Sequence, residues 1–485
     1  MSLFPRLAAA DSRLALIIGE HAWTYAQLAE AASQHVALLE RVGVESGERV
    51  AVWAHPSPST AAAMLGNFAA GVTTIPLNPK LGSGEVAHIF RDSDPKLAFC
   101  AESFDVPHEV LHVPSLRAAY APGEGALADI DEDATPGLIL YTSGTTGPPK
   151  GAVITRANIA ANLDSLIEAW EWTARDTVVH SLPWIHAHGL VLGLLGSLRA
   201  GGALHFVPKF SPAGIAAAIT DARHQDTMCF AVPTMYHRIA EAAEESPALC
   251  KAFRRPRLLV SGSAGLSLRE HEHIRALTGR GVHERYGLTE TLINCGVPAS
   301  SEPMPGYVGP PLPGVELKLV DEQRNELDAH DDETIGEVAV RSRAVFAGYL
   351  NREDATAEVL GADGWFYTGD LATRREDGAI RILGRRSTDL IKTGGYRVGA
   401  GEIEACLLEH PAVREVAVVG VPDEDLGQRL EAFVVLKSGH DEPADALVAH
   451  VTEQLSPHKR PRGVHFLAEL PRNAMGKVQK KLLGS

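Results

Sequence analysis

Short apolar segments alternate with alanine-rich segments of helical periodicity up to about residue 306, and this alternation most constrains the fold. Residues 25–39 place Leu28, Ala32, Val36 and Leu39 three or four positions apart, as in an amphipathic helix. Strands that alternate with helices tend to lie parallel in a sheet that the helices cover. The sequence therefore predicts an α/β fold with mostly parallel sheets flanked by helices. The predicted strands are 49–53, 72–76, 137–140, 152–154, 178–182, 203–207, 228–232 and 257–260, and a further helix is predicted over 59–70.

The pattern changes after Gly306, where short β runs and turns predict a smaller β-rich subdomain over about 306–384. Residues 1–384 are thus predicted to form a large N-terminal domain. The polar segment 385–389 predicts a hinge, with Thr388 or Asp389 as the pivot, and residues 390–485 predict a small α+β domain. Within that domain the predicted elements are a helix near 403–407, strands at 416–421 and 432–436, and a helix over 443–455.

Composition narrows the class of protein. A chain of 485 residues is too long for one ordinary domain, and 61 acidic against 45 basic residues give a net charge of −16. This charge argues against a nucleic-acid partner and requires a local cationic site for any anionic substrate. The five cysteines contain no Cys-x-x-Cys pair, which favours reduced thiols over a zinc cluster or disulfide framework. No apolar run approaches the roughly 18 residues of a membrane span, so no membrane partner and a cytoplasmic protein are expected.

A polar, glycine-rich loop over residues 141–151 separates two of the predicted strands. Glycines permit close approach of the backbone to a ligand, and hydroxyls, backbone N–H groups and Lys150 can all bind phosphate oxygens. The alternative is an ordinary surface turn. A Walker A phosphate loop is not indicated, because no suitably spaced Gly-Lys-[Ser/Thr] is present. The eleven-residue pattern favours a phosphate-binding loop.

The loop resembles the phosphate-binding signature of the adenylate-forming superfamily of acyl-CoA synthetases, adenylation domains and luciferases. Four further segments resemble that superfamily in the same order along the chain. These segments are Tyr286–Glu290, Tyr367–Asp370, Gly384-Arg385 and Pro471–Lys477. Members of the superfamily first form an acyl-adenylate from ATP and an acid, and then transfer the acyl group to coenzyme A after a mobile C-terminal domain rotates. The resemblance implies an acid–thiol ligase of this type.

The resemblance also implies a task for each matching residue. ATP phosphates would bind the loop over Thr142, Ser143, Gly144, Thr145 and Thr146, with Mg²⁺ held by Thr146 and Glu290. The other nucleotide-binding residues implied are Tyr286, Gly287, Thr289, Asp370 and Arg385, and the loop 261–265 would add Ser263 and Ala264. Lys477, Glu290 and Thr289 are the implied catalytic residues, since positive charge stabilises the charge that builds on phosphate oxygens. ATP, Mg²⁺ and coenzyme A are the implied ligands.

Two arginines bear on the acid that is activated. In the superfamily, the segment containing Arg238 and the position of Arg285 face the acyl pocket. A guanidinium binds a carboxylate through two parallel hydrogen bonds, whereas an apolar acid would leave it buried and unpaired. We therefore expect a small dicarboxylic acid, bound by Arg238, Arg285, His188 and Ser261. Segments 185–189, 235–238, 284–287 and 388–396 resemble malonyl-CoA synthetases of the bacterial malonate-utilisation type, which implies malonate, with methylmalonate as a second substrate.

Several alternatives stay open at this level. Each arginine is either functional or part of a structural ion pair, and His188 either faces the pocket or caps the following helix. The chain could activate a hydrophobic acid, serve a carrier protein in trans, or bind nucleotides or acyl groups without catalysis. A lysine acetyltransferase acting on Lys477 is a further hypothesis, because acetylation would remove the charge of that lysine.

Overall fold

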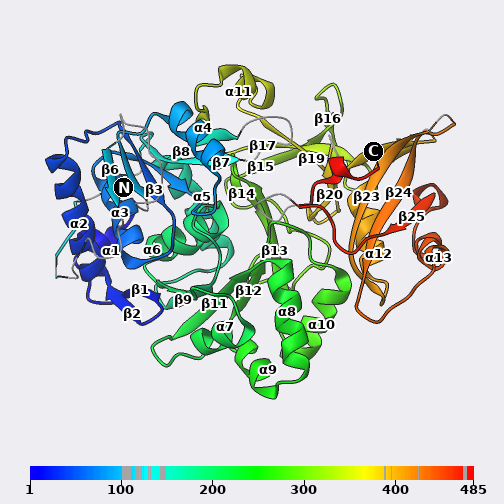
Figure 1. Cartoon of the computed structure of the whole chain (residues 1–485), viewed down its shortest axis with the longest axis horizontal. Coiled ribbons are helices and arrows are strands. Elements are labelled where there is room, and N and C mark those ends of the chain that lie inside the picture. Colours follow the sequence, from blue (N-terminus) through cyan, green and yellow to red (C-terminus); the bar gives the residue numbers. More distant parts are fainter. Residues whose placement is uncertain are drawn as a thin grey trace.

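The computed structural model describes residues 1–100, 111–114, 120, 123, 125–128, 130–131, 133–142, 149–386, 389–394, 396–423, 425–472 and 478–484. Three sheets with their helices form the N-terminal part, and a fourth sheet forms a separate C-terminal lobe (Figure 1). The α/β class predicted from the alternation, with a β-rich subdomain and an α+β C-terminal domain, is confirmed. None of the described helices is long and apolar enough to cross a membrane.

An eight-stranded sheet carries Ser261, Arg285, Tyr286 and Gly287 among the candidate site residues. Its order is β14-β13-β12-β11-β9-β10-β1-β2, and all neighbours are parallel except the two edge strands β2 and β14. The strands are β1 (Leu14–Ile18), β2 (His21–Thr24), β9 (Asp176–His180), β10 (Ala203–Phe206), β11 (Asp226–Ala231), β12 (Leu258–Ser261), β13 (Val282–Leu288) and β14 (Leu292–Gly296). Because the parallel strands are buried on both faces, they read as continuous apolar runs in the sequence.

A seven-stranded sheet of order β18-β8-β7-β4-β3-β5-β6 lies beside the first. Its strands are β3 (Arg49–Trp53), β4 (Thr73–Leu77), β5 (Leu97–Cys100), β6 (Leu111–Pro114), β7 (Pro136–Thr142), β8 (Lys150–Thr155) and β18 (Gly348–Tyr349). The strands β3 to β7 pair in parallel, whereas β7 and β8 form an antiparallel hairpin. The predicted phosphate-binding loop therefore connects the two strands of this hairpin.

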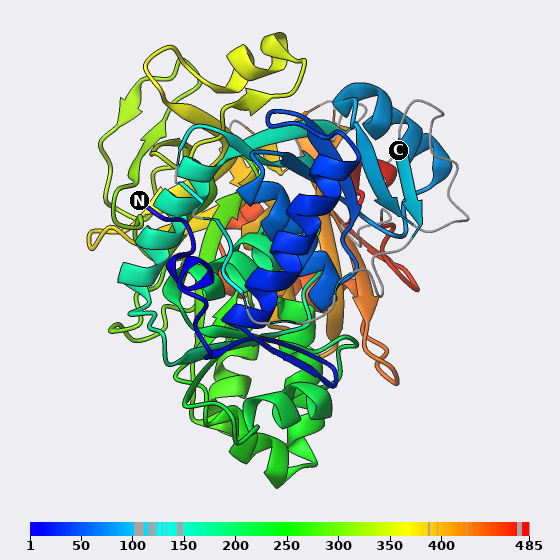
Figure 2. The same ribbon diagram turned by 90° about the vertical axis from the view of Figure 1, so that its left-hand side faces the viewer.

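The helices α2 (Tyr25–Arg41) and α3 (Pro58–Ala69) pack against each other and contact both sheets. Figure 2 shows α2 running across the side of the molecule that faces the viewer. The N-terminus of α2 has a capping box, in which Thr24 accepts from the backbone N–H of Gln27. Buried His35 on α2 links the two helices, since its Nε2 lies 2.7 Å from Asn67 Oδ1 on α3.

The remaining helices of the N-terminal part cover the sheets or connect their strands. They are α1 (Pro5–Ala8), α4 (Ser83–Ser93), α5 (Arg156–Ala169), the π-helix η1 (His188–Leu195), α6 (Gly196–Ala200), α7 (Pro212–Ile219), α8 (Pro233–Glu244), α9 (Pro247–Phe253), α10 (Leu268–Thr278) and α11 (Glu353–Val359).

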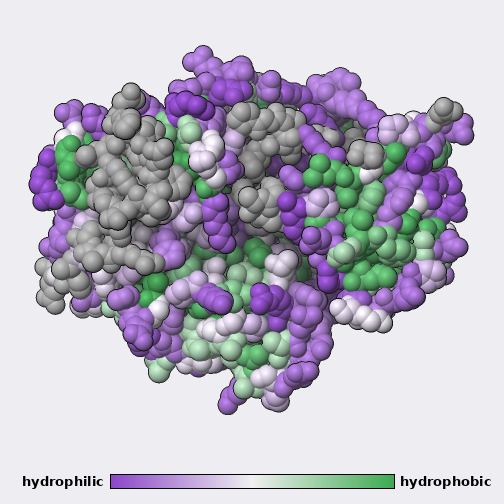
Figure 3. Space-filling model, viewed as in Figure 1, coloured by the Kyte–Doolittle hydropathy of each residue, from purple (hydrophilic) through white to green (hydrophobic). Residues whose placement is uncertain are grey.

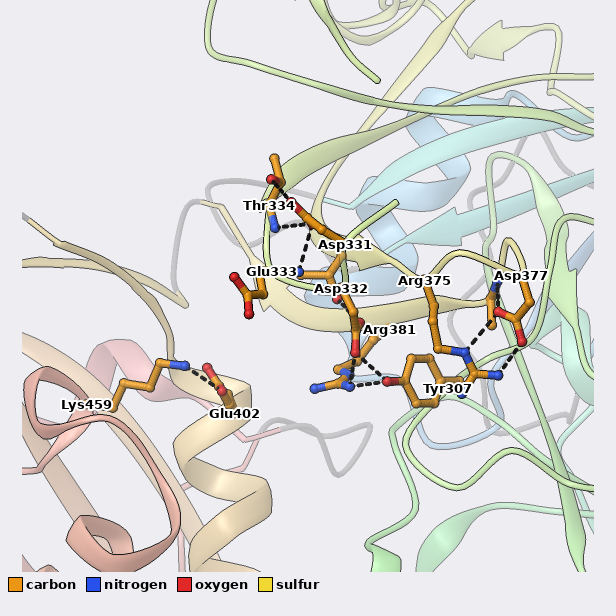
Figure 4. Close-up of polar contacts among 12 residues, drawn as sticks. Tyr307, Asp331, Asp332, Glu333, Thr334, Arg375, Asp377, Arg381, Glu402 and Lys459 are labelled. Carbon is orange, nitrogen blue, oxygen red and sulfur yellow. Dashed lines mark hydrogen bonds and ion pairs between the residues drawn. The ribbon is translucent and has the colours of Figure 1, made fainter. Parts of the chain in front are cut away.

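The β-rich subdomain is an antiparallel five-stranded sheet of order β16-β15-β17-β19-β20. Its strands are β15 (Glu316–Val320), β16 (Glu326–Leu327), β17 (Gly336–Arg341), β19 (Phe366–Arg374) and β20 (Ile380–Arg385). A polar cluster ties the segment before β17 to the last two strands (Figure 4). Asp332 accepts hydrogen bonds from the Tyr307 hydroxyl at 2.5 Å, from Thr373 Oγ1 at 2.9 Å and from Arg381. The cluster fixes the β19–β20 hairpin, which ends at Arg385, where the predicted hinge segment 385–389 begins.

The C-terminal lobe is a mixed sheet with helices on one face. Its elements are β21 (Leu390–Thr393), β22 (Tyr396–Gly399), α12 (Ala400–Leu408), β23 (Val413–Asp423), β24 (Gly427–Leu436), α13 (Ala444–Gln454), η2 (Pro457–Lys459), β25 (Gly463–Phe466) and η3 (Lys480–Leu482). Buried side chains of α12 and α13, including Ile403, Leu407 and Leu447, form its own core with the sheet. Hydrophobic side chains also gather on the surface of this lobe (Figure 3). The boundaries predicted for the domains and hinge stay predictions.

Candidate active site

The predicted phosphate-binding loop, residues 141–151, includes the end of β7 at Thr142 and the start of β8 at Lys150. Ser143, Gly144, Thr145 and Thr146 lie outside the described residues. The Lys150 ammonium lies 4.2 Å from the centroid of the Tyr349 ring, and the Tyr349 hydroxyl donates to Glu290 Oε1 at 2.7 Å. The base of the loop and the candidate magnesium ligand are therefore joined through one tyrosine.

Glu290 lies in the short connection between β13 and β14, and the end of β13 just before it requires glycine at position 287. A Cβ atom on Gly287 would come within 1.8 Å of the Leu292 carbonyl oxygen. The Glu290 side chain is buried, and its backbone carbonyl accepts from Phe346 N–H at 2.8 Å. Thr289, in the same turn, is half-buried. A buried carboxylate with one hydroxyl donor keeps oxygen lone pairs for a hard cation such as Mg²⁺.

Asp370 contacts two side chains, Tyr286 and Arg385, that the sequence analysis predicted to bind the nucleotide. The Tyr286 hydroxyl donates to Asp370 Oδ2 at 2.6 Å, and Arg385 Nε lies 2.8 Å from Asp370 Oδ1. Asp370 and Arg385 face each other in the register of β19 and β20. The next residue, Arg386, instead pairs with Glu337 at 2.7 Å. The structure thus distinguishes the two consecutive arginines and places Arg385 with the carboxylate.

Burial raises the pKa of the Tyr286 hydroxyl well above its ordinary value of 10, and the neighbouring Asp370 carboxylate raises it further. The hydroxyl therefore remains a donor at neutral pH. A carboxylate oriented by one tyrosine and one arginine suits the two hydroxyls of a ribose, because carboxylate oxygens accept several hydrogen bonds.

The loop after β12 holds an unusual backbone conformation. Ser263 has φ of +79°, a left-handed value that is uncommon for non-glycine residues. Ser263 and Ala264 are exposed on this loop. Buried Glu284 fixes the end of the loop, since its carboxylate accepts from Leu266 N–H at 2.9 Å and lies 3.1 Å from His271 Nε2.

Three buried polar side chains without partners among the described residues define a candidate acid pocket. The atoms without a hydrogen-bond partner are Nε of Arg285, both ring nitrogens of His188 and Oγ of Ser261. Ser261 ends β12, Arg285 lies on the adjacent β13, and His188 begins η1 with its ring 5.9 Å from that of Phe230 on neighbouring β11. Ligands of open α/β sheets bind at the carboxyl ends of such strands.

The Arg285 guanidinium packs directly on the backbone beside Ser261. A Cβ atom on Gly262 would lie 2.4 Å from Arg285 Nε, so a larger residue at position 262 would force the guanidinium to move. Burial lowers the pKa of Arg285 to about 10. Burial lowers the pKa of His188 well below its ordinary value, and the Arg285 charge lowers it further. The pocket therefore combines a cationic guanidinium with a neutral imidazole at physiological pH.

Arg238, on α8, is exposed and has an aromatic neighbour. The buried face of α8 carries Tyr236 and Ile239, whereas Arg238 is exposed and its guanidinium lies 5.0 Å from the Phe210 ring centroid. The pairing of Arg238 with Arg285 stays a prediction. Lys477 lies outside the described residues, and the chain enters and leaves its segment at Arg472 and Val478, which form an antiparallel bridge.

Comparison with protein families gives two matches. The AMP-binding enzyme family matches residues 5–350, and the AMP-binding enzyme C-terminal domain matches residues 402–477. A malonate–CoA ligase of Arabidopsis thaliana is 35% identical, with 93% of this chain and 80% of that protein covered. A mitochondrial malonate–CoA ligase of Homo sapiens is 34% identical, with 99% and 91% covered. A sulfoacetate–CoA ligase of Cupriavidus necator is 33% identical, with 96% and 92% covered.

Solved structures give the same picture. ATP-bound MatB from Rhodopseudomonas palustris matches with a TM-score of 0.90 at 36% identity, over 100% of this chain and 98% of that chain. A malonyl-CoA ligase product complex with methylmalonyl-CoA and AMP matches with a lower TM-score of 0.72 at 49% identity, over 97% and 100%. The less identical protein is thus the closer in overall arrangement. The chain belongs to the family of AMP-binding enzymes, and malonate–CoA ligases are among its relatives.

Proposed function

We propose that this protein is an ATP- and Mg²⁺-dependent malonate–CoA ligase, which also takes methylmalonate and releases AMP and pyrophosphate. The observation that carries the proposal is the buried Arg285 guanidinium, whose Nε has no partner among the described residues and whose charge lowers the pKa of buried His188. A buried charge without a partner is costly, and a second carboxylate on the substrate would pair with it. An acid with an apolar tail would leave the charge unpaired.

In the first half-reaction, the proposed role of Arg285, His188 and Ser261 is to hold the distal carboxylate. His188 is neutral and donates through one ring nitrogen, while Arg285 supplies the charge. The near carboxylate is then free to attack the α-phosphorus of ATP. A new carboxyl-oxygen–phosphorus bond forms, the bond to the pyrophosphate oxygen breaks, and the product is a mixed anhydride of malonate and AMP.

The nucleotide-binding tasks follow the same proposal. The loop over Thr142–Thr146 holds the phosphates, Asp370 accepts from the ribose hydroxyls, and Glu290 and Thr146 hold Mg²⁺, which neutralises charge on the phosphate oxygens. Tyr349 orients the Glu290 carboxylate through its 2.7 Å hydrogen bond. Lys477 stabilises the charge that develops at the α-phosphate.

In the second half-reaction, the thiol sulfur of coenzyme A attacks the carbonyl carbon, AMP leaves with the bridging oxygen, and the thiol proton passes to water. The proposal includes a rotation of the C-terminal domain between the two steps. Polar contacts between the lobes support it. Lys392 pairs with Glu322 at 3.3 Å through exposed side chains, and Arg269 N–H donates to Glu409 at 2.9 Å. Such contacts re-form with water at little cost.

The proposal also covers the location of the enzyme and its regulation. We propose a cytoplasmic enzyme, which cell fractionation with a tagged chain would test against the mitochondrial location in the name of the human relative.

Acetylation of Lys477 by a lysine acetyltransferase would abolish adenylation by removing the charge. Unchanged activity of a fully acetylated sample would refute that regulatory role.

The test is pyrophosphate release with ATP and Mg²⁺ across malonate, methylmalonate, succinate, sulfoacetate, acetate, octanoate and coumarate, with thioesters identified by mass. Turnover confined to malonate and methylmalonate would support the proposal. If sulfoacetate were the best acid, the role of the cationic pocket would stand but the proposed substrate would change to sulfoacetate, the acid in the name of one relative. A preference for octanoate or coumarate would refute the role of Arg285, and adenylate formation without thioester would favour a carrier protein in trans.

A further inference from the structure

The C-terminal tail folds back onto the sheet of its own lobe. Val478 and Leu483 pack in a small core with Ala417, Val435 and Leu470, on a cluster separate from the one that α12 and α13 cover. Gln479 N–H donates to the Pro471 carbonyl at 2.8 Å, next to the bridge that joins Arg472 and Val478. The segment that contains Lys477 is thus bounded on both sides by residues that pair with each other.

Lys480, three residues beyond Lys477, places its ammonium between two carboxylates. Lys480 Nζ lies 2.6 Å from Glu404 Oε1 on α12 and contacts Asp389 Oδ1. The three side chains are only 17%, 20% and 14% exposed, respectively. Glu404 Oε1 also accepts from Val418 N–H at 2.7 Å on β23. Ion pairs this buried are specific in geometry, because removing one partner leaves an uncompensated charge.

Asp389 connects this ion pair to the nucleotide site. Its other oxygen, Oδ2, accepts from the backbone N–H of Arg385 at 2.8 Å, and the Arg385 side chain pairs with Asp370 at 2.8 Å. The contact is close, because a Cβ atom on Gly384 would lie 2.5 Å from Asp389 Cβ. Figure 1 shows the tail (red) close to β20 and β23. A continuous series of polar contacts thus joins Asp370 to Lys480.

We infer that Lys480 is a positioning residue for the adenylation step. It ties the tail that follows Lys477 to Asp389 in the hinge segment, so that Lys477 is presented to the nucleotide when Asp389 is held by Arg385. Lys480 itself contacts no substrate. The inference rests on the proposed function, in which Lys477 acts at the α-phosphate. Removal of the ammonium would leave Asp389 and Glu404 facing each other without a cation, and the two carboxylates would repel.

The experiment compares Lys480→Met with Lys480→Arg, and uses Lys481→Met, an exposed neighbour with the same change of charge, as the matched control. The assay is malonate-dependent exchange of labelled pyrophosphate into ATP, which reports adenylation without coenzyme A. We expect Lys480→Met to lower kcat by about ten- to a hundredfold while the KM values for malonate and ATP change by less than about threefold. Lys480→Arg should recover most of the rate, and Lys481→Met should match the wild type.

A double-mutant comparison separates positioning from general support of the fold. If Lys480 acts through Lys477, Lys480→Met should cause no further loss in a Lys477→Ala background. Additive losses, or a Lys480→Met rate within about twofold of the wild type, would overturn the inference. If circular dichroism shows that Lys480→Met does not fold, the same comparison is made with Glu404→Gln, which removes one charged acceptor of the Lys480 ammonium. A wild type that adenylates another acid and not malonate would refute the proposed substrate, and the same comparison would then be run with that acid.

Discussion

Replacement of Arg285 by Met should move stability and activity in opposite directions. The guanidinium is buried, its Nε has no partner among the described residues, and burial lowers its pKa from 12.5 to about 10. A change of this size corresponds to on the order of 3 kcal/mol against the charged form in the empty site. Methionine has a similar length and no charge, so most of that cost should disappear. We therefore expect the unliganded variant to melt at a higher temperature than the wild type.

The activity of Arg285→Met should fall, because the distal carboxylate of malonate would lose its cationic partner. Truncating one member of a buried, hydrogen-bonded charge pair costs about 2–5 kcal/mol, equivalent to a loss of about 30- to 5,000-fold in kcat/KM. The loss should be large for malonate and small for acetate, which has no second carboxylate. The assays are differential scanning fluorimetry without ligands and pyrophosphate release with each acid.

Arg343→Met, at an exposed position, serves as the matched control and should change neither quantity. Arg238→Met tests the second arginine of the sequence-based prediction. A malonate kcat/KM within about threefold of the wild type for Arg285→Met, or an equal loss for malonate and acetate, would refute the assignment of Arg285 to the distal carboxylate.

Three further predictions concern the metal site, a backbone constraint and pH. Glu290→Gln should raise the Mg²⁺ concentration for half-maximal rate by about tenfold or more, with a smaller rise for Tyr349→Phe, and equal titrations would contradict the Mg²⁺ assignment. Gly287→Ala should lose ATP binding, measured by calorimetry, because the new Cβ would lie 1.8 Å from the Leu292 carbonyl oxygen; wild-type affinity would show that the turn can relax. Burial lowers the pKa of His35 from 6.5 to about 4, so the unfolded chain is protonated first and stability should fall as pH decreases from 6.5 towards about 4, by up to about 3 kcal/mol. Urea unfolding should show a shallower decline for His35→Gln, and identical slopes would refute the contribution of His35.

Much of the fold could be predicted because each element carries its own local signal. The apolar run at 49–53 coincides with β3 (Arg49–Trp53), and the helix predicted over 59–70 appears as α3 (Pro58–Ala69). Both follow from periodicity and from caps that adjoin the element, such as Ser57 before α3. The cap of α10 (Leu268–Thr278) likewise adjoins the helix, since Ser267 accepts from the backbone N–H of Glu270.

Other elements had no local signal. The strand β18 is only two residues long and pairs with β8 far away in the sequence, so nothing near Tyr349 indicated a strand or a partner for Glu290. The same holds for Lys480, because its partners Glu404 and Asp389 come from another helix and from the hinge segment. Contacts between distant segments depend on packing and register, which hydrophobic periodicity does not encode.

The sequence alone determined the class of chemistry. Segments that can be read in order along the chain, from the glycine- and hydroxyl-rich loop to the lysine near the end, resemble those of adenylate-forming enzymes, and this resemblance implied phosphate and Mg²⁺ chemistry. Only the tertiary structure decided which charged groups are buried without partners. Arg285 and Arg238 are alike as letters, yet one lies against Gly262 inside the protein and the other is exposed beside Phe210. The cost of an unpaired charge depends on its removal from water, and that is a property of the folded protein.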